Sequence, residues 1–553
     1  MREWWRGGVI YQVYPRSFQD TNGDGVGDLP GIMRRLDHIA SLGVEAIWLS
    51  PIQQSPQADM GYDVSDYTEV DRRFGTLEDF DSLIERAHAL GLKVIIDQVL
   101  SHTSHDHPWF RESRLSRTNA RADWYVWADP KRDGSPPNNW ASVFGGRAWE
   151  WNPSRGQYYL HNFLAEQPDL NFHNPAVQDA VLDVMRFWLE RGVDGFRLDT
   201  VNYYFHDKQL RNNPAARRPK HLPYAVNPYD MQEHRYGKSQ PENVGFLKRV
   251  RKLLDEFPET TTVGEIGDSD RGIELMEQYT AGRDKLHMAY TFDMLGKKFF
   301  AGHFRSKISE FFTGAPNGWP CWAFSNHDVE RHVSRWSAYS RDRTALARQT
   351  AAMLMSFRGS VCLYQGEELG LPETDMLFEE LTDPPGIRFW PEYKGRDGCR
   401  TPMPWDDGKA PNGFTTGKPW LPMKPPQSAL NVAHQEADPD SILNFYRRIL
   451  AFRRDNPVLI EGGMEFIKTA EPVLAFRRTA AKAGGMLCVF NLSAEPVRIA
   501  LEGESEPLPI SQAASVTGGR LDLDANGYAF FAETARSRIG LKFNRRPKPK
   551  AAA

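Results

Sequence analysis

Eight short apolar segments, separated by stretches with helical spacing, constrain the fold of this chain most strongly. Between the first two, Ile32, Leu36 and Ile39 recur at helical spacing, and Gly43 follows as a helix-stop residue. Segments that are apolar on both faces suit strands buried on both sides, which is typical of a parallel sheet. The count predicts an α/β fold, a (β/α)8 TIM barrel, with strands at residues 9–14, 44–49, 92–99, 195–199, 261–266, 288–293, 321–326 and 361–365.

The barrel pattern is interrupted between the third and fourth strand segments. Asp97 and Asp199 end these segments, and they are much farther apart than the roughly 30 residues of one βα unit. The intervening residues 101–168, rich in turns and tryptophan, are therefore a predicted inserted subdomain. The remaining predicted parts are the barrel (1–100 and 169–468, with an irregular extension at 370–430), a C-terminal antiparallel β domain (469–541) and a solvated tail (542–553).

Composition excludes several classes of protein. The 553 residues carry a net charge of −4, which gives no reason to expect a nucleic-acid or membrane-surface partner. No apolar run is long enough to span a membrane, and the first residues show no signal-peptide pattern. The four cysteines lack CxxC spacing and suggest reduced thiols, with one disulfide as the alternative. We therefore expect a cytoplasmic monomer or homodimer that acts on a small molecule, and the 12% of aromatic residues slightly favours a carbohydrate.

Charged side chains follow several predicted strands, and in a barrel these strand ends meet at one face. Arg197 and Asp199 end the fourth strand, Glu265 ends the fifth, and Asp328 follows the seventh. Glycoside cleavage needs one carboxyl that is protonated near neutral pH and another that is ionised. Arg197 and Asp199 point to the same side of their strand, so the arginine favours an ionised Asp199. We therefore predict a glycosidase with Asp199 as nucleophile, Glu265 as acid/base and Asp328 as the group that binds sugar hydroxyls.

Seven short motifs are distributed along the chain. They are Asp97–His102, Gly195–Asp199, Val263–Glu265, Phe324–Asp328, Gly61–Tyr67, Gln167–Asn171 and Arg400–Trp405. The first four resemble motifs of glycoside hydrolase family 13, the α-amylase family, and the last three resemble its oligo-1,6-glucosidase/α-glucosidase branch. The resemblance covers nearly the whole chain, and it implies the same three carboxylate roles with retention of anomeric configuration.

The resemblance also implies which residues would hold the substrate. The sugar in the first subsite would be held by His102, Arg197 and His327. Tyr62 would be its stacking platform. Phe144 and Phe163, from the insertion, would border the entrance and the acceptor side, with simple core packing as the alternative for both.

Three further residues bear on how the substrate is cut. By resemblance, Asp59 pairs with Arg400, and together they bind the non-reducing-end hydroxyl and close the pocket, so that one terminal glucose is removed. A surface salt bridge of little energetic weight is the alternative. Thr200 directly follows the nucleophile, and relatives with Thr there tend towards α-1,4 links, whereas Val goes with α-1,6 links.

A loop near the start of the chain predicts a structural cation. Oxygen ligands at alternate positions resemble the start of an EF-hand, although the Glu of a full EF-hand is replaced by Gly31. A plain Asp/Gly turn is the alternative. Family relatives bind Ca²⁺ or Mg²⁺ at such a loop, and no organic cofactor is expected. The predicted ligands are Asp20, Asn22, Asp24, the Val26 carbonyl and Asp28.

The sequence thus predicts an exo-acting, retaining α-glucosidase that releases α-glucose from maltose and short α-1,4-glucosides through a covalent glucosyl-enzyme. Transglucosylation follows where an alcohol outcompetes water. The alternatives are an oligo-1,6-glucosidase, a sucrose- or trehalose-acting glucosyltransferase or isomerase, and a non-catalytic, transporter-associated binding module. The last is disfavoured because all three carboxylates are present.

Overall fold

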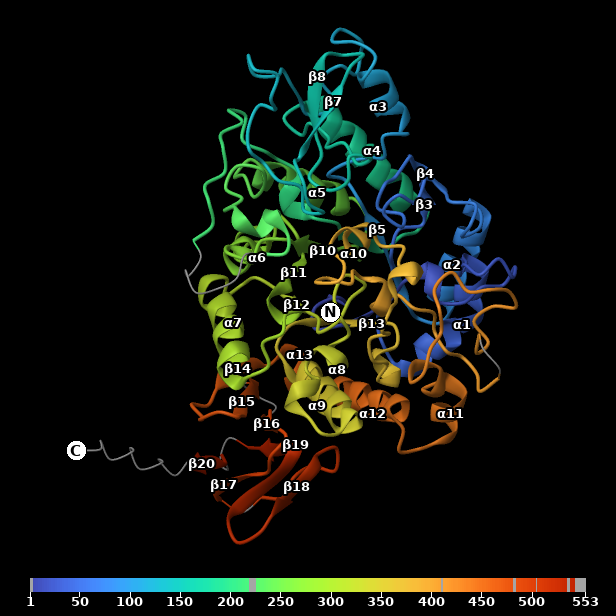
Figure 1. The fold of residues 1–553 in the computed structure, drawn as a ribbon. Helices are drawn as coiled ribbons and strands as arrows, with labels where there is room; N and C mark the ends of the chain where they lie inside the picture. Colours follow the sequence, from blue (N-terminus) through green and yellow to red (C-terminus); the bar gives the residue numbers. More distant parts are fainter. Residues whose placement is uncertain are drawn as a thin grey trace, which may run out of the picture.

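The structure is a computed structural model that describes residues 3–217, 225–408, 411–480, 484–503, 505–534 and 538–542. Figure 1 shows a central barrel, with an inserted subdomain at the top of the view and a β domain at the bottom. The predicted tail, 542–553, lies outside the described residues except for Lys542.

The barrel is a sheet of eight parallel strands in the order β11-β10-β9-β5-β2-β1-β13-β12. A parallel bridge between Ala289 and Pro320 joins its two ends. Each strand overlaps a segment predicted from the sequence, so the (β/α)8 fold is confirmed. The strands are β1 (Val9–Val13), β2 (Ala46–Leu49), β5 (Lys93–Gln98), β9 (Gly195–Leu198), β10 (Thr261–Ile266), β11 (Met288–Thr291), β12 (Cys321–Trp322) and β13 (Ser360–Tyr364).

Local sequence explains where the barrel helices begin and end. Asp28 accepts a hydrogen bond from Gly31 N at the start of α1, and Gly43 ends this helix at a φ of 82°. Thr76 and Asp79 form a capping box at the start of α2. The longer helices are α1 (Leu29–Leu42), α2 (Leu77–Ala89), α4 (Pro175–Glu190), α5 (Asn243–Leu254), α6 (Gly272–Thr280), α7 (Ala301–Gly314), α9 (Arg343–Ser356) and α12 (Ile442–Asp455).

The inserted subdomain contains a three-stranded antiparallel sheet in the order β6-β8-β7, with a small apolar core around Trp140 and Trp149. A segment that follows β9 packs on it unexpectedly: the Trp140 Nε1–H donates to the carbonyl of Arg211 at 2.8 Å. The elements of the insertion are α3 (Pro108–Ser113), β6 (Trp127–Ala128), β7 (Trp149–Asn152) and β8 (Gln157–Leu160). A separate two-stranded sheet, β3 (Gln53–Gln54) and β4 (Asp66–Val70), lies in the chain between β2 and α2.

The C-terminal domain is an antiparallel sheet that begins at Gly463, earlier than the predicted boundary at 469. Its first strand is short and half-buried, so it shows no clear alternation of apolar and polar residues. The domain packs on the barrel through contacts such as Gln349 Nε2 with the Asn491 carbonyl at 2.7 Å. Its strands are β14 (Gly463–Phe466), β15 (Val473–Ala480), β16 (Gly484–Asn491), β17 (Val497–Glu502), β18 (Gln512–Val516), β19 (Arg520–Glu533) and β20 (Gly540–Lys542).

The predicted extension at 370–430 has little regular structure and follows β13. It contains the short helix α10 (Pro384–Arg388). The other short helices of the barrel domain are α8 (His332–Arg335), α11 (Val432–Ala437) and α13 (Pro457–Glu461). In the part of the chain that the structure describes, all four cysteines are buried and free, and no helix has the length and apolar character needed to cross a bilayer.

Candidate active site

A cavity of about 480 Å³ lies over the carboxyl ends of the barrel strands. Side chains from the barrel, the insertion and the extension all line it. The predicted site residues that line it are Asp59, Tyr62, His102, Phe144, Phe163, Asp199, Thr200, Glu265 and Asp328. The other three, Arg197, His327 and Arg400, are almost fully buried and contact these lining residues from behind.

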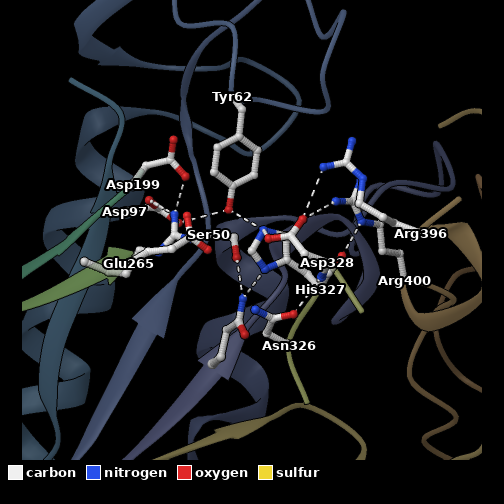
Figure 2. Close-up of polar contacts among 12 residues, drawn as sticks. Ser50, Tyr62, Asp97, Asp199, Glu265, Asn326, His327, Asp328, Arg396 and Arg400 are labelled. Atoms are coloured by element: carbon white, nitrogen blue, oxygen red, sulfur yellow. Dashed lines mark hydrogen bonds and ion pairs between the residues drawn. The ribbon is translucent and has the colours of Figure 1, made fainter. Parts of the chain in front are cut away.

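Arg197 joins the carboxylates at the floor of the cavity. Its Nη1 lies 2.6 Å from Asp199 Oδ1 and 2.9 Å from Asp97 Oδ1, and its Nη2 lies 2.6 Å from Glu265 Oε1. The strand register explains this, because Asp97 and Arg197 are paired in adjacent strands and Val263 pairs with Arg197 on the other side. Figure 2 shows Asp97, Asp199 and Glu265 gathered on one side of Tyr62, with Asp328 on the other.

Burial changes the protonation of the two carboxyls that Arg197 holds. It raises the pKa of Glu265 to about 7, although Arg197 opposes the rise. It also raises the pKa of Asp199 to about 7, again against the effect of Arg197. Arg197 does favour ionisation of Asp199, as expected, but burial outweighs its effect on the pKa. Near neutral pH the pair can hold one proton, which is the state that double displacement requires.

Glu265 is also held by two neutral donors. The Tyr290 hydroxyl donates to its Oε1 at 3.0 Å, and the Thr200 backbone N–H donates to its Oε2 at 3.2 Å. Thr200 has a φ of 39°, which is a left-handed conformation rare for a β-branched residue. Strain of this kind clusters at functional sites, where surrounding contacts enforce it. The turn after Asp199 therefore carries the N–H that orients Glu265.

Asp328 lies among cations and stays ionised. Burial alone would raise the pKa of its carboxyl, but the positive guanidinium groups of Arg396 and Arg400 lower it below the usual range. Oδ1 lies 3.0 Å from Arg400 Nη2 and 3.2 Å from Arg396 Nη1, and Oδ2 lies 3.3 Å from His327 Nε2. Asp328 is thus ionised near neutral pH, whereas Asp199 and Glu265 can hold one proton between them, although all three line one cavity.

Tyr62 forms a wall of the cavity with support from behind. Its ring stacks on His327 at a centroid distance of 5.3 Å and an interplanar angle of 5°. His102 lies beside it, with Nε2 2.9 Å from the Tyr62 carbonyl. Gln167, from the branch-like Gln167–Asn171 motif, donates to Asp59 Oδ2 at 3.1 Å. A flat ring, an imidazole and two polar side chains, all of them buried, therefore converge at one end of the cavity.

The predicted pairing of Asp59 with Arg400 is wrong in this structure. Asp59 Oδ1 lies 2.8 Å from Arg396 Nη2, and Arg396 also contacts Asp328 and Asp383. Arg400 instead donates to the His327 carbonyl at 2.7 Å and to Asp328. The reason is position, because Arg396 lines the cavity whereas Arg400 lies fully buried behind Asp328. Arg396 stands four residues before Arg400, the first residue of the Arg400–Trp405 motif, and the sequence alone does not say which arginine reaches Asp59.

The mouth of the cavity is aromatic. Phe144 and Phe163 do line it, with ring centroids 5.6 Å apart, and Tyr203 lies 5.5 Å from Phe163. The sequence did not predict Tyr203 or three further rings at this site, since no sequence pattern shows that an isolated aromatic residue outside a strand lines a cavity. The missed rings are Phe292, Phe389 and Tyr393.

The predicted cation loop, residues 20–28, is a series of tight turns. Asp20 Oδ1 accepts two backbone N–H groups, Asn22 accepts the N–H of Asp24, and Asp24 accepts the N–H of Val26 at 2.8 Å. Asp28 caps α1. These donors are the hard oxygens that Ca²⁺ and Mg²⁺ prefer. Within the described ranges, however, no three carboxylate, imidazole or thiol side chains converge as a metal site, so cation binding stays a prediction.

Comparison with known proteins gives the class of enzyme. A model described as the α-amylase catalytic domain matches residues 12–462. A probable α-glucosidase of Rhizobium meliloti (strain 1021) is 59% identical over 501 residues, with 89% of this chain and 90% of that protein covered. An oligo-1,6-glucosidase of Heyndrickxia coagulans is 38% identical over 532 residues, with 90% and 93% covered.

Comparison with solved structures indicates the same family. The α-glucosyl transfer enzyme XgtA superposes with a TM-score of 0.93 and 54% identity, covering 96% of this chain and 100% of that one. The trehalulose synthase MutB of Pseudomonas mesoacidophila MX-45 gives a TM-score of 0.85 and 33% identity over the same shares. The barrel and its carboxylate site are those of a glycosidase. The chain belongs to the α-amylase family, glycoside hydrolase family 13, in its α-glucosidase branch, as the sequence motifs predicted.

Proposed function

We propose that the protein is an exo-acting, retaining α-glucosidase that removes α-glucose from the non-reducing end of maltose and short α-1,4-glucosides. The observation that carries this proposal is the single guanidinium of Arg197, which lies 2.6 Å from both Asp199 and Glu265. Retaining enzymes need two carboxyls only about 5–5.5 Å apart, whereas inverting enzymes leave room for a water between them. Two carboxyls on one guanidinium support the closer spacing.

The proposed reaction has two steps. Asp199 attacks the anomeric carbon while Glu265 gives its proton to the leaving oxygen, which forms a glucosyl ester and frees the aglycone. Glu265 then takes a proton from water as the water attacks the same carbon, releasing α-glucose and restoring both carboxyls. Asp328, held ionised by Arg396 and Arg400, binds sugar hydroxyls and favours the oxocarbenium-like state.

The closed end of the cavity supports exo action. Arg396 joins Asp59 to Asp328 there, and Gln167 buttresses Asp59 from the other side. This wall leaves room for the terminal glucose of a chain and stops a longer glucan from passing through. Asp59 and Arg396 therefore take the non-reducing-end role that the sequence had assigned to Asp59 and Arg400.

The aromatic mouth supports transglucosylation to alcohol acceptors. Apolar rings such as Phe144 and Tyr203 shield the glucosyl-enzyme from water and offer faces to an acceptor. A relative of known structure, XgtA, is described as an α-glucosyl transfer enzyme. Hydrolysis and transfer then compete for one intermediate.

Two other activities within the family are alternatives to α-1,4-glucosidase activity, because relatives of this chain are named for them. They are an oligo-1,6-glucosidase, as in Heyndrickxia coagulans, and a sucrose-acting isomerase, as in MutB. Thr200, whose hydroxyl lies 3.2 Å from Asp199 Oδ2, favours α-1,4 links in the proposal. A Thr200→Val variant whose ratio of isomaltose to maltose cleavage equals that of the wild type would remove Thr200 from this role.

One experiment tests the proposed function. Products from maltose, isomaltose, sucrose and trehalose are followed in time, with and without an added alcohol. We expect glucose from maltose first, and an alkyl α-glucoside when alcohol is present. Isomaltulose or trehalulose from sucrose, without glucose from maltose, would replace the proposal with the isomerase alternative.

A structural Ca²⁺ or Mg²⁺ held by Asp20, Asn22, Asp24, the Val26 carbonyl and Asp28 is part of the proposal. The chain of Asp and Asn turns supports it, because such turns present oxygens on one side of a loop. Such an ion would hold the loop and supply no catalytic step, since two carboxyls perform the chemistry. Four buried thiols, free in the described residues, support the proposed cytoplasmic location.

A further inference from the structure

A buried glutamine contacts His327 on the side of the ring that faces away from the cavity. Gln12, on β1, is fully buried, and its Nε2 lies 2.7 Å from His327 Nδ1 and 3.1 Å from Ser50 Oγ. None of the motifs that marked the site includes Gln12, and it does not line the cavity. Figure 2 shows Tyr62 above the His327 ring, Ser50 to its left and Asp328 to its right.

The neighbours of His327 determine which ring nitrogen carries the proton. His327 Nε2 lies 3.3 Å from Oδ2 of the ionised Asp328 and 2.5 Å from the Tyr62 hydroxyl. A lone pair facing a carboxylate at that distance would be repulsive, so Nε2 carries a proton. Burial, together with Arg400, Arg197 and Arg396, lowers the pKa of His327 well below its ordinary value, so the ring is neutral and Nδ1 is bare.

The hydrogen bonds of Tyr62 are consistent with a proton on His327 Nε2. Tyr62 has one hydroxyl proton, and Asp97 Oδ2 lies 3.0 Å away to accept it. Burial raises the pKa of Asp97 to about 6, so at neutral pH it is mainly an acceptor. Tyr62 then accepts from His327 Nε2–H, which leaves Nδ1 to accept from the Gln12 amide.

We propose that Gln12 is a positioning residue of the reaction: its amide N–H groups hold His327 as the neutral tautomer protonated on Nε2, so that this proton faces Asp328 and Tyr62. Removing the donor frees the ring to exchange tautomers, and a bare Nε2 would then repel Asp328. The kinetic part of this inference rests on the proposed function, whereas the tautomer itself does not.

Nitrogen NMR of ¹⁵N-histidine-labelled protein tests the tautomer directly, with a His327→Asn variant to assign the signals. We expect wild-type His327 to show a bare Nδ1 and a protonated Nε2 at pH 7.5. A protonated Nδ1 in the wild type would overturn the proposal whatever substrate the enzyme cleaves, so its failure is distinguishable from failure of the proposed function.

Two substitutions test the consequence. In Gln12→Glu the carboxylate can only accept, so Nδ1 should become protonated, and kcat on maltose should fall at least tenfold with a smaller change in KM. Gln12→Met removes both hydrogen bonds at similar volume and should also lower kcat, with averaged tautomer signals. Ser50→Ala, the control, leaves the Gln12–His327 bond and should keep the wild-type tautomer. Unchanged kcat and tautomer in folded Gln12→Met would contradict the proposal.

A second and independent feature lies at the opposite end of the barrel, in the loops that precede the strands. A cavity of about 430 Å³ there is lined by three arginines and Trp319, with no carboxylate among its described lining residues. Arg6 precedes β1, Arg283 precedes β11 and Arg358 precedes β13.

The arginines gather positive charge around one indole. The guanidinium carbons of Arg6 and Arg358 lie 4.7 Å and 5.8 Å from the Trp319 ring centroid. Arg6 is paired with Glu3 at 2.9 Å. Arg358 is half-buried, and its guanidinium forms no hydrogen bond or ion pair with any described residue, while burial and Arg6 lower its pKa. A guanidinium has five donors in a fork that matches a tetrahedral oxyanion.

We infer that this cavity, defined by Arg6, Arg283, Arg358 and Trp319, binds a phosphate group, either free or on a sugar. Such an anion would neutralise the crowded guanidinium groups and supply the missing acceptors. The site is remote from the carboxylate pocket, so its occupation would act on stability and not on the chemical step.

Calorimetric titration with inorganic phosphate at low ionic strength tests the site. We expect saturable binding that weakens at least tenfold in Arg358→Gln and is unchanged in Arg72→Gln, an exposed arginine elsewhere. Glucose 1-phosphate is the second probe: tighter binding assigns the site to a phosphorylated sugar, and equal binding to free phosphate. Absence of saturable binding, or equal binding by the Arg358 variant, would overturn the inference.

Discussion

Two layers of the barrel interior lie only two residues apart on the same strands and have opposite character. The lower layer is apolar, whereas the layer above it carries hydrogen-bonding and charged groups, and on β1, β2, β5, β10 and β11 only Trp48 and Tyr290 of the upper layer also pack in the apolar cluster. Successive inward positions alternate along a strand with a period of two, so each strand contributes to both layers. The pairs are Ile10 and Gln12, Ala46 and Trp48, Ile95 and Asp97, Val263 and Glu265, and Met288 and Tyr290.

This difference indicates that the lower layer contributes mainly to folding stability and the upper layer mainly to catalysis. Ile95 and Met288 are fully buried and gain from leaving water. Asp97 and Glu265 are as buried but would cost free energy if unpaired, and only Arg197 and neighbouring donors make their burial tolerable. Damage to the lower layer should therefore unfold the protein, and damage to the upper layer should abolish activity without unfolding it.

Asp199→Asn should give the largest effect and sharpens the contrast. Without the carboxylate no glucosyl ester forms, so activity on an aryl α-glucoside should fall by about 10⁴-fold or more. Steady-state rates measure the loss, and circular dichroism checks that the fold is kept. Retention of more than a tenth of wild-type activity would remove Asp199 from the nucleophile role.

Ile95→Ala probes the layer beneath. The cavity it leaves should lower the free energy of unfolding by about 2–5 kcal/mol, whereas Ile95→Val should cost about 0.5–1.5 kcal/mol. Denaturant titration measures both, and kcat of the folded fraction should stay within about threefold of wild type. A variant that kept full stability but lost its activity would break the proposed division between the layers.

Glu265→Gln tests the cost of the buried carboxylate. Burial raises the pKa of Glu265 from 4.5 to about 7, so the folded state holds this proton more tightly than the unfolded chain does. The stability contributed by the protonated form is full below pH 4.5 and is lost as pH rises through about 7. We therefore compare the free energy of unfolding of the variant with that of the wild type at both pH values. The difference should favour the variant by about 1–3 kcal/mol more at pH 8 than at pH 4. A gain of equal size at both pH values would argue against the raised pKa.

Removal of the proposed cation should give the smallest effect, because loop 20–28 lies outside both layers. If the loop binds Ca²⁺ or Mg²⁺, a chelator should lower the melting temperature by a few degrees, at about 2–4 °C per kcal/mol of lost binding, and excess metal should restore it. Asp24→Ala, whose side chain is largely free of tertiary partners, should abolish the response. A melting curve unaffected by chelation would leave the plain turn as the explanation.

Much of this organisation follows from local sequence. The eight strands are apolar runs that only a doubly covered sheet can bury, and Thr76 and Gly43 mark helix ends by their own backbone chemistry. The three carboxylates could be predicted as neighbours because parallel strands bring their carboxyl ends to one face. These features depend on short-range rules that each segment carries by itself.

Contacts between residues far apart in the sequence could not be predicted in the same way. Asp59 and Arg396 are separated by 337 positions, and only the path of an irregular extension decides that Arg396, and not Arg400, reaches Asp59. The contact of Trp140 with the backbone of Arg211 joins two loops without periodicity. The sequence predicts Gln12 only as part of the buried strand at residues 9–14, since nothing in its sequence neighbourhood shows that His327 lies beside it.

The most direct test of the central claim is the anomeric form of the first sugar released. If Asp199 and Glu265 work as a closely spaced pair on one guanidinium, ¹H NMR of a fresh maltose digest should show α-glucose before mutarotation produces the β form. Initial release of β-glucose would mean a single displacement by water, and would contradict the proposed covalent glucosyl-enzyme.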